Sequence, residues 1–338
     1  MKEVTNRFGT GTFYEIEDVP GKIYARCTAC MSVYTDLLSW AQQNPDRMTT
    51  NIAEADSVIV LGCQVTDLAI LNDLRHAESI DHENIFMSGC LAQRFDIDIP
   101  YKRLDVVRIE NEPINDFSLV EWAKPFWEKD FEDGDDNLKP GNLFRNYYPL
   151  KIGAGCKLSC KYCTIRDTRG DYYEANAYDQ VGEFLSHENV VLISDNPTDR
   201  QVLDWCSIAT KYNKPISFRN MEPSTVTRCW NELFALSQAG LLDILHCPIQ
   251  SESLWLVRQM NRNSIATGAF LKVAFILRTF GTKLATNVII DYTIDGTLYP
   301  NCNKDYLDRE FDYWVWNPYF DGNWDREKAE ARWEKYLT

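Results

Sequence analysis

The chain has 338 residues, of which 45% are hydrophobic and 25% charged, with 16 Gly and 13 Pro. This composition excludes a disordered or collagen-like protein, and the length favours two domains. With 35 Lys and Arg against 50 Asp and Glu, the net charge of −15 provides no molecule-wide footprint for nucleic acid. The apolar runs are shorter than the roughly 18 residues that span a bilayer, and the N-terminus has no signal-like apolar segment. We therefore expect a cytoplasmic protein without a membrane partner.

Short β-rich segments alternate with helical segments in the first part of the sequence. Strands are expected at residues 22–26, 57–61, 84–87 and 106–109, and helices at 35–42 and 66–77. This alternation indicates a small parallel α/β sheet. The charged stretch 128–140, which contains Gly and Pro but no apolar periodicity, predicts an acidic linker. We therefore expect an N-terminal domain over residues 1–127.

Six further strands are expected beyond the linker. They lie at residues 148–152, 190–194, 215–219, 243–249, 284–292 and 313–318, mostly separated by helical segments. Six strands that alternate with helices are typical of a partial (β/α)6 barrel, which we expect over residues 141–338. An amphipathic helix at 326–337 ends the sequence. In such barrels the chemistry takes place at the carboxyl ends of the strands.

Three closely spaced cysteines follow the first strand of this predicted barrel. They are Cys156, Cys160 and Cys163. Cysteines of a cytosolic chain are kept reduced, so clustered cysteines point to metal binding or catalysis. Three thiolates favour a [4Fe-4S] cluster with one iron open to a substrate. The alternative is a zinc site completed by a fourth ligand such as His187 or Cys206.

The segment 145–170, RNYYPLKIGAGCKLSCKYCTIRDTRG, resembles the core motif of radical S-adenosylmethionine (radical SAM) enzymes, and more narrowly that of the methylthiotransferases. Further similarity lies at 218–223, 246–253, 260–262 and 317–319. The resemblance implies a [4Fe-4S] cluster whose open iron binds SAM, and reductive cleavage of SAM to methionine and a 5′-deoxyadenosyl radical. It also implies an electron donor such as flavodoxin or ferredoxin. The expected SAM contacts are Ser194, Asp195, Arg219, Gln250 and Ser251.

Three separated cysteines, Cys30, Cys63 and Cys90, each follow an expected strand or its loop. Such loops share one edge of a parallel sheet, so the three thiols could bind a second [4Fe-4S] cluster. Any one of them alone is better explained as a small buried residue. The methylthiotransferases carry three such cysteines in their N-terminal domain, and the GCLAQ sequence at 89–93 matches their third site. Asp36, six residues after Cys30, matches their first site, and Cys27 is the alternative ligand.

The resemblance implies that this auxiliary cluster supplies sulfur, which requires a sulfide source. The expected reaction inserts sulfur and transfers a methyl group at an unactivated C–H bond of a modified adenosine of tRNA near the anticodon. The alternative substrate is a ribosomal-protein side chain, because ribosomal proteins are basic and this chain is acidic.

A different class of function is a non-catalytic iron–sulfur or zinc protein in which the metal builds structure or senses oxidation. No side chain is assigned a catalytic role, because the cofactor carries the chemistry. His246 is interpreted as a hydrogen-bonded core histidine. Family members usually end in a small β-barrel domain, whereas this sequence stops one helix after the last strand, so we expect a shortened member.

Overall fold

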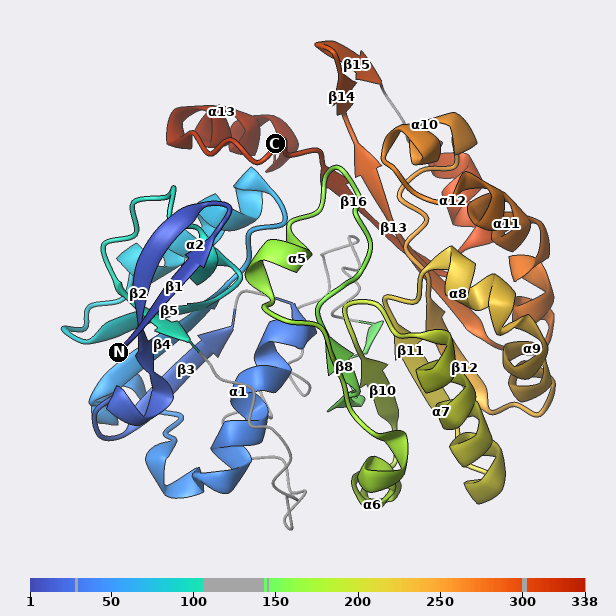
Figure 1. Cartoon of the computed structure of the whole chain (residues 1–338), viewed down its shortest axis with the longest axis horizontal. Coiled ribbons are helices and arrows are strands. Elements are labelled where there is room, and N and C mark those ends of the chain that lie inside the picture. Colours follow the sequence, from blue (N-terminus) through green and yellow to red (C-terminus); the bar gives the residue numbers. More distant parts are fainter. Residues whose placement is uncertain (28–29, 106–142, 145, 300–302, 338) are drawn as a thin grey trace. The chain divides into compact units, whose positions relative to one another are not determined.

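The computed structural model describes residues 1–27, 30–105, 143–144, 146–299 and 303–337 (Figure 1). The chain divides into two compact units. Unit 1 comprises Met1–Phe126, Thr164–Gly170 and Phe320–Thr338. Unit 2 comprises Trp127–Cys163 and Asp171–Tyr319. The expected linker at 128–140 and the expected strand at 106–109 lie outside the described residues. The two short segments that join unit 1 had no counterpart in the sequence analysis.

Unit 1 contains a six-stranded sheet with the order β1-β2-β6-β5-β4-β3. Its strands are β1 (Lys2–Asn6), β2 (Gly9–Glu15), β3 (Ile23–Cys27), β4 (Ser57–Gly62), β5 (Ile85–Gly89) and β6 (Lys102–Asp105). β1 and β2 pair antiparallel, and the other neighbours pair parallel. The expected parallel α/β arrangement is confirmed, with an N-terminal hairpin added to it. The hairpin escaped the sequence analysis because its strands are mostly exposed and lack a run of apolar residues.

Two of the described helices of unit 1 follow its parallel strands, and the other two lie in the separate segments 164–170 and 320–338. They are α1 (Met31–Gln43), α2 (Asp67–Glu78), α5 (Ile165–Thr168) and α13 (Arg326–Leu337), with 3₁₀ turns η1 (Ile16–Asp18), η2 (Pro45–Arg47), η3 (Ile52–Glu54) and η4 (Leu91–Gln93). All six residues of β4, SVIVLG, are buried, as expected for a central parallel strand covered on both faces. α2 begins after Thr66, whose hydroxyl accepts a hydrogen bond from the Ala69 N–H at 3.0 Å.

Unit 2 contains a second six-stranded sheet, in which every neighbouring pair is parallel. Its strands are β7 (Tyr148–Lys151), β10 (Val190–Ile193), β11 (Ile216–Arg219), β12 (Leu242–His246), β13 (Lys283–Ile290) and β16 (Tyr313–Pro318). Their order, β16-β13-β12-β11-β10-β7, follows the chain from one edge to the other. This open sheet confirms the predicted partial barrel, and all six expected strands are present.

Helices separate the strands of unit 2. They are η6 (Ala177–Gln180), α6 (Val181–Ser186), α7 (Asp199–Tyr212), α8 (Pro223–Arg228), α9 (Trp230–Gln238), α10 (Leu254–Gln259), α11 (Ser264–Thr279) and α12 (Lys304–Glu310). Helices α7, α9 and α11 lie on one side of the sheet (Figure 1). Two antiparallel pairs complete the unit: β8 (Gly153–Ala154) with β9 (Tyr173–Glu174), and β14 (Tyr292–Ile294) with β15 (Thr297–Tyr299). Among the described helices none is long and apolar enough to cross a membrane.

Candidate metal centres

Three cysteines of unit 1 lie at the carboxyl ends of three neighbouring parallel strands. Cys30 follows β3, Cys63 follows β4 directly, and Cys90 follows β5 directly. The pKa of the Cys63 thiol lies well above its usual value because the thiol is buried and because charges on Cys30, Asp73 and Cys90 lie nearby. The structure thus brings together three thiols that are separated by 33 and 27 positions in the sequence.

The position of Cys30 favours it over Cys27 as the first member of this set. Cys27 is the last residue of β3, whereas Cys30 is the N-cap of α1. The charges of Cys30, Asp73 and Cys90 act on the Cys63 thiol. The choice of Cys30 remains a prediction, which single substitutions can decide.

Gly89 allows the end of β5 to approach its neighbours closely. Its φ of +77° lies in the left-handed region, which favours glycine. A Cβ atom at this position would lie 2.7 Å from the Gly62 carbonyl oxygen and 2.7 Å from a methyl carbon of Val33. The residue before Cys90 therefore has to be glycine if the β4 and β5 ends are to stay together.

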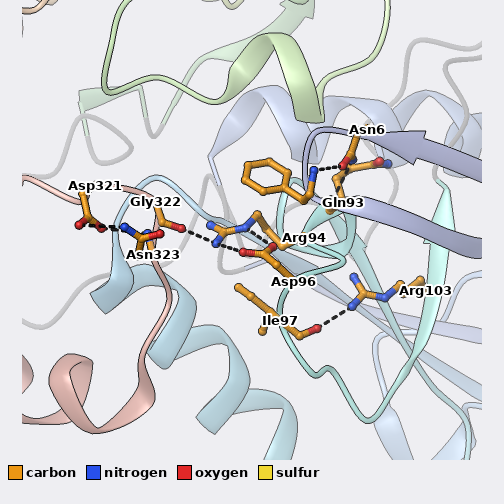
Figure 2. A network of polar contacts seen from close by, with 10 residues as sticks. Asn6, Gln93, Arg94, Asp96, Ile97, Arg103, Asp321, Gly322 and Asn323 are labelled. Carbon is orange, nitrogen blue, oxygen red and sulfur yellow. Dashed lines mark hydrogen bonds and ion pairs between the residues drawn. The ribbon is translucent and has the colours of Figure 1, made fainter.

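Side chains from distant parts of unit 1 hold the turn that carries Cys90. The Asn6 amide donates a hydrogen bond to the Gln93 carbonyl at 2.9 Å (Figure 2). Arg103 donates to the Ala92 carbonyl at 2.5 Å. Both carbonyls belong to η4, which begins directly after Cys90. These bonds satisfy backbone groups of a short turn and thereby define the direction in which it leaves the sheet.

Arg94 connects the same turn to the C-terminal segment Phe320–Thr338. Its side chain is fully buried and forms two bonds to Asp96, at 2.7 and 2.6 Å, and one to the Gly322 carbonyl at 2.7 Å (Figure 2). The guanidinium also lies 4.5 Å from the ring centroid of Phe8. Arg94 therefore fastens the start of the C-terminal segment to the part of unit 1 that positions Cys90.

Two polar residues near Cys63 were not identified from the sequence. The buried carboxylate of Asp73 accepts a hydrogen bond from the Cys63 N–H at 2.5 Å. Gln64, next to Cys63, is 2% exposed, and neither its amide nitrogen nor its amide oxygen has a hydrogen-bond partner among the described residues. A buried amide in this state is costly unless a water, ion or bound group satisfies it. Three neighbouring thiols fit a bound iron–sulfur cluster.

In unit 2 the three closely spaced cysteines lie in the loop that follows β8. The Gly155 N–H donates to the Asp195 carboxylate at 2.8 Å, which holds the loop where it begins. Burial raises the pKa of the Cys156 thiol, and the charges of Cys160 and Asp195 raise it further. The Cys163 N–H donates to the Cys160 carbonyl at 3.2 Å, so the last two cysteines share one turn.

A segment that follows α10 holds the middle of this loop. The Lys161 N–H donates to the Met260 carbonyl at 3.1 Å. The Asn261 amide donates to the Ser159 carbonyl at 2.9 Å and contacts the Ser159 hydroxyl at 3.0 Å. Asn261 has a φ of +59°, a conformation that asparagine tolerates better than most residues. The cysteine loop is thus fixed by backbone contacts as well as by its own turns.

Arg262 adds a buried charge to this attachment. It forms an ion pair with Glu222 and donates a hydrogen bond to the Tyr162 hydroxyl at 3.1 Å. Tyr162 lies between Cys160 and Cys163 in the sequence, and burial together with the charges of these cysteines raises the pKa of its hydroxyl. The Tyr162 ring packs against an apolar cluster formed by Leu256, Met260, Ile289 and Tyr292. The sequence analysis noted both segments but assigned no role to this pair.

Arg219, one of the expected SAM contacts, is the last residue of β11, and its side chain is only 8% exposed. Within the described part of the chain, its Nε and Nη1 atoms have no hydrogen-bond partner.

Burial and the nearby charge of Arg219 lower the pKa of His246 to about 3, so this histidine is neutral. The His246 Nδ1 accepts from the Asn220 N–H at 3.2 Å, and Nε2 then donates to the Asn287 side chain at 3.2 Å. The interpretation of His246 as a hydrogen-bonded core residue is confirmed.

Ser194 and Asp195 lie directly after β10. The Ser194 hydroxyl is buried and accepts a hydrogen bond from the Asn196 N–H at 3.3 Å. Asp195 is the residue that accepts from Gly155, at the start of the cysteine loop. Both expected SAM contacts therefore lie beside the loop, and Asp195 also has a structural role.

Gln250 and Ser251 follow β12. Gln250 has a φ of +67°, donates its N–H to the Asn287 carbonyl at 2.9 Å and accepts from the Ile289 N–H at 2.8 Å, so its backbone is paired with β13. The Ser251 hydroxyl is fully buried and accepts from the Ser253 N–H at 3.1 Å. All five expected SAM contacts thus lie at the carboxyl ends of β10, β11 and β12.

The two residues considered as a fourth zinc ligand have other neighbours. The His187 ring stacks on the Tyr148 ring with centroids 3.6 Å apart, and Cys206 is buried on α7 near Cys229. Among the described residues, no three His, Cys, Asp or Glu side chains are grouped as ligation of a single metal ion requires. Thiolates of a [4Fe-4S] cluster bind different irons, so they need no such grouping.

Comparison with curated proteins agrees with the resemblance seen in the sequence. No family model matches the chain. A tRNA-2-methylthio-N(6)-dimethylallyladenosine synthase of Rickettsia felis is 25% identical over 286 residues, covering 71% of this chain and 63% of the relative. The protein of the same name from Rickettsia rickettsii is 26% identical over 289 residues, with the same coverage. A solved methylornithine synthase covers 77% of this chain and 66% of its own at 10% identity, with a TM-score of 0.32. The chain is a distant homologue of the tRNA methylthiotransferases and spans less than two thirds of their length.

Proposed function

We propose that this distant homologue of the tRNA methylthiotransferases is a radical SAM methylthiotransferase with two [4Fe-4S] clusters. One cluster is held by Cys156, Cys160 and Cys163, and the other by Cys30, Cys63 and Cys90. The observation that carries this proposal is the presence of two three-thiol sets, one where three parallel strands of unit 1 end and the other in the loop after β8, which follows the parallel strand β7. A set of three leaves one iron of each cluster without a protein ligand.

When bound, the clusters would cleave SAM reductively and provide the sulfur. The chain itself would hold the clusters and SAM in position. The Nε and Nη1 atoms of the Arg219 guanidinium are buried without a hydrogen-bond partner among the described residues, so an incoming carboxylate such as that of SAM would satisfy them. Ser194 and Gln250 lie at the neighbouring strand ends. The Arg262–Glu222 pair holds the cysteine loop through Tyr162, which limits the movement of the loop.

The proposed substrate is a modified adenosine of tRNA near the anticodon, as the names of the two relatives suggest. A cationic cavity supports an RNA substrate. Lys157, next to Cys156, lines a cavity of about 300 Å³ together with Arg200, Arg228 and one carboxylate, Asp199, which pairs with Arg228. Cations in a concave surface suit phosphate groups, even on a chain whose net charge is negative.

A ribosomal-protein side chain is the second candidate substrate, favoured by the net charge of −15, which attracts basic proteins. Either reaction needs an external electron donor such as flavodoxin or ferredoxin and a sulfide source. The proposed place of action is the cytoplasm, where the thiols stay reduced.

Metal content tests the cofactor part of the proposal. Anaerobic reconstitution of the full chain should yield two clusters by iron and sulfide count. Alanine substitution of the Cys156, Cys160 and Cys163 set should leave one cluster, and so should substitution of the Cys30, Cys63 and Cys90 set. Cys27→Ala is the matched control and should retain both. A single tightly bound zinc would rule out the proposal.

Nucleoside mass spectrometry tests the reaction. tRNA from cells that lack their own methylthiolation should gain a methylthio-adenosine when this chain is expressed, and lose it with Cys63→Ala or Cys160→Ala. Formation of 5′-deoxyadenosine without any change in tRNA would point to the ribosomal-protein substrate. Intact clusters that produce no 5′-deoxyadenosine under reduction would favour a non-catalytic iron–sulfur protein instead.

A further inference from the structure

Residues Thr164–Gly170 follow Cys163 directly in the chain but belong to unit 1. Their short helix α5 contacts η4, which begins directly after Cys90. An ion pair of 3.3 Å between Asp167 and Arg7 adds a partly exposed contact within the same unit. We call residues 164–170 the strap, because they continue from one cysteine set and are attached beside the other.

Arg169 makes the buried attachment of the strap. Its Nη1 lies 2.8 Å from the Asp36 carboxylate, and its Nη2 donates to the carbonyl oxygen and the hydroxyl of Ser32, both at 3.0 Å. The Arg169 and Asp36 side chains are only 6% and 9% exposed. Ser32 and Asp36 lie in the first two turns of α1, whose N-cap is Cys30.

The geometry of these bonds makes Arg169 a positioning contact. A planar guanidinium that bonds a carboxylate, a hydroxyl and a carbonyl at once accepts few orientations, whereas a lysine would supply only a point charge. Buried ion pairs are weak contributors to stability, because both charges lose their hydration. Arg169 therefore serves to define where the strap lies on α1, two residues beyond Cys30.

We propose that the strap couples the two cysteine sets and that Arg169 is its positioning residue. The inference rests on the proposed function. The strap is attached to α1 and η4, and these two elements begin at Cys30 and Cys90. When Cys30 and Cys90 ligate a cluster, the starts of both elements become fixed, and so does the strap that continues from Cys163. A cluster bound at Cys30, Cys63 and Cys90 therefore fixes the strap, and the fixed strap determines how much of the SAM cleavage leads to sulfur transfer.

Hydrogen exchange tests the coupling without relying on activity. In the full, anaerobically reconstituted chain, amides of residues 164–170 should exchange at least about tenfold faster in Cys63→Ala, which lacks the auxiliary cluster. Arg169→Gln and Asp36→Asn should have the same effect. Arg332→Gln is the matched control, because it breaks another ion pair of unit 1, to Asp67 at 2.5 Å, and should change strap exchange less than about twofold.

Exchange that is raised by Arg169→Gln but unaffected by Cys63→Ala would overturn the proposal, because the strap would then be a structural contact only. If Arg169→Gln does not fold, Asp36→Asn and Arg169→Lys provide the same comparison. Lysine should restore only part of the protection, because it cannot make the three bonds at once.

Product ratios test the functional consequence. Arg169→Gln should retain both clusters and form 5′-deoxyadenosine within about twofold of the wild-type rate, while methylthiolated product per 5′-deoxyadenosine falls at least about tenfold. An unchanged ratio, or an equal fall in both products, would place Arg169 outside the coupling and overturn the inference. A wild-type chain that forms no methylthiolated product would instead refute the proposed function, while the exchange experiment would still decide whether the strap responds to the auxiliary site.

Discussion

Arg262 and Glu222 form an ion pair whose side chains are only 4% and 6% exposed. The same guanidinium donates a hydrogen bond to Tyr162, between the second and third cysteines of the loop in unit 2. The charge pair therefore lies next to the proposed SAM cluster, and its loss should affect both stability and iron binding.

Glu222→Gln and Arg262→Met should each destabilise the chain by about 3–5 kcal/mol, because each leaves one buried charge without its partner. The measurement is urea unfolding of the full chain. In Arg262→Met, the cluster on Cys156, Cys160 and Cys163 should also be lost more readily to an iron chelator, because Tyr162 loses its donor.

The control for this prediction is Arg228→Gln. Arg228 pairs with Asp199 at 2.5 Å, but the two side chains are 55% and 38% exposed. Solvent screening limits such a pair to about 1 kcal/mol or less. Equal losses of stability in Arg228→Gln and Arg262→Met would contradict the role assigned to burial.

Gly89→Ala should destabilise unit 1 and weaken the auxiliary cluster. The positive φ alone costs an alanine about 1–2 kcal/mol, and the new Cβ would also meet the Gly62 carbonyl at 2.7 Å. Gly240→Ala separates these two effects, because Gly240 has a φ of +69° and open space around its Cβ position. Thermal unfolding should show a larger loss for Gly89→Ala than for Gly240→Ala. Iron content should fall by one cluster only in Gly89→Ala, and two variants with the same stability and iron content would refute the close-approach argument.

Arg94→Met should loosen the C-terminal segment Phe320–Thr338 from the rest of unit 1. Each lost bond from this fully buried guanidinium contributes about 1.5–3 kcal/mol, since charged groups form stronger hydrogen bonds. Limited proteolysis should cleave within the segment faster in the variant. Arg326→Gln, which breaks a half-exposed pair with Glu78, should leave the cleavage rate near that of the wild type. Unchanged cleavage in Arg94→Met would show that α13 holds the segment by itself.

His246 should make the stability of the chain sensitive to acid. Its folded pKa of about 3 lies below the usual value of about 6.5, so the unfolded chain binds the proton more readily. Stability from the neutral form is therefore present above about pH 6.5 and is lost as the pH falls towards 3, by up to about 1.4 kcal/mol per pH unit.

Urea unfolding between about pH 7 and pH 4.5 checks this contribution. The difference in unfolding free energy between wild type and His246→Gln should narrow as the pH falls. His82→Gln, which removes a half-buried histidine of unit 1, is the control. It measures how the unfolding free energy changes with pH when a different histidine is lost. Parallel curves for the wild type and His246→Gln would mean that His246 is protonated without penalty in the folded chain.

Local sequence patterns sufficed for all six strands of the second sheet and for β3, β4 and β5 of the first. The runs at β4 and β10 consist of residues that are buried on both faces, and such runs are recognisable because parallel strands are covered by helices. The hairpin of β1 and β2 was missed because its strands are largely exposed. The spacing of Cys156, Cys160 and Cys163 predicted a metal-binding loop from the sequence alone, since three ligands within eight residues lie in the same loop.

By itself, then, the sequence determined the six strands of the second sheet, the cysteine loop and the resemblance to the methylthiotransferases, because these depend on short-range spacing. Only the tertiary structure placed Asp73 beside Cys63, at the sheet edge where the sequence led us to expect the three cysteines. It also decided that Arg262 holds Tyr162, and that Arg169 returns to Asp36 across 133 positions of sequence. Contacts at such separations leave no local pattern, because packing of whole elements selects them after the strands and helices have formed.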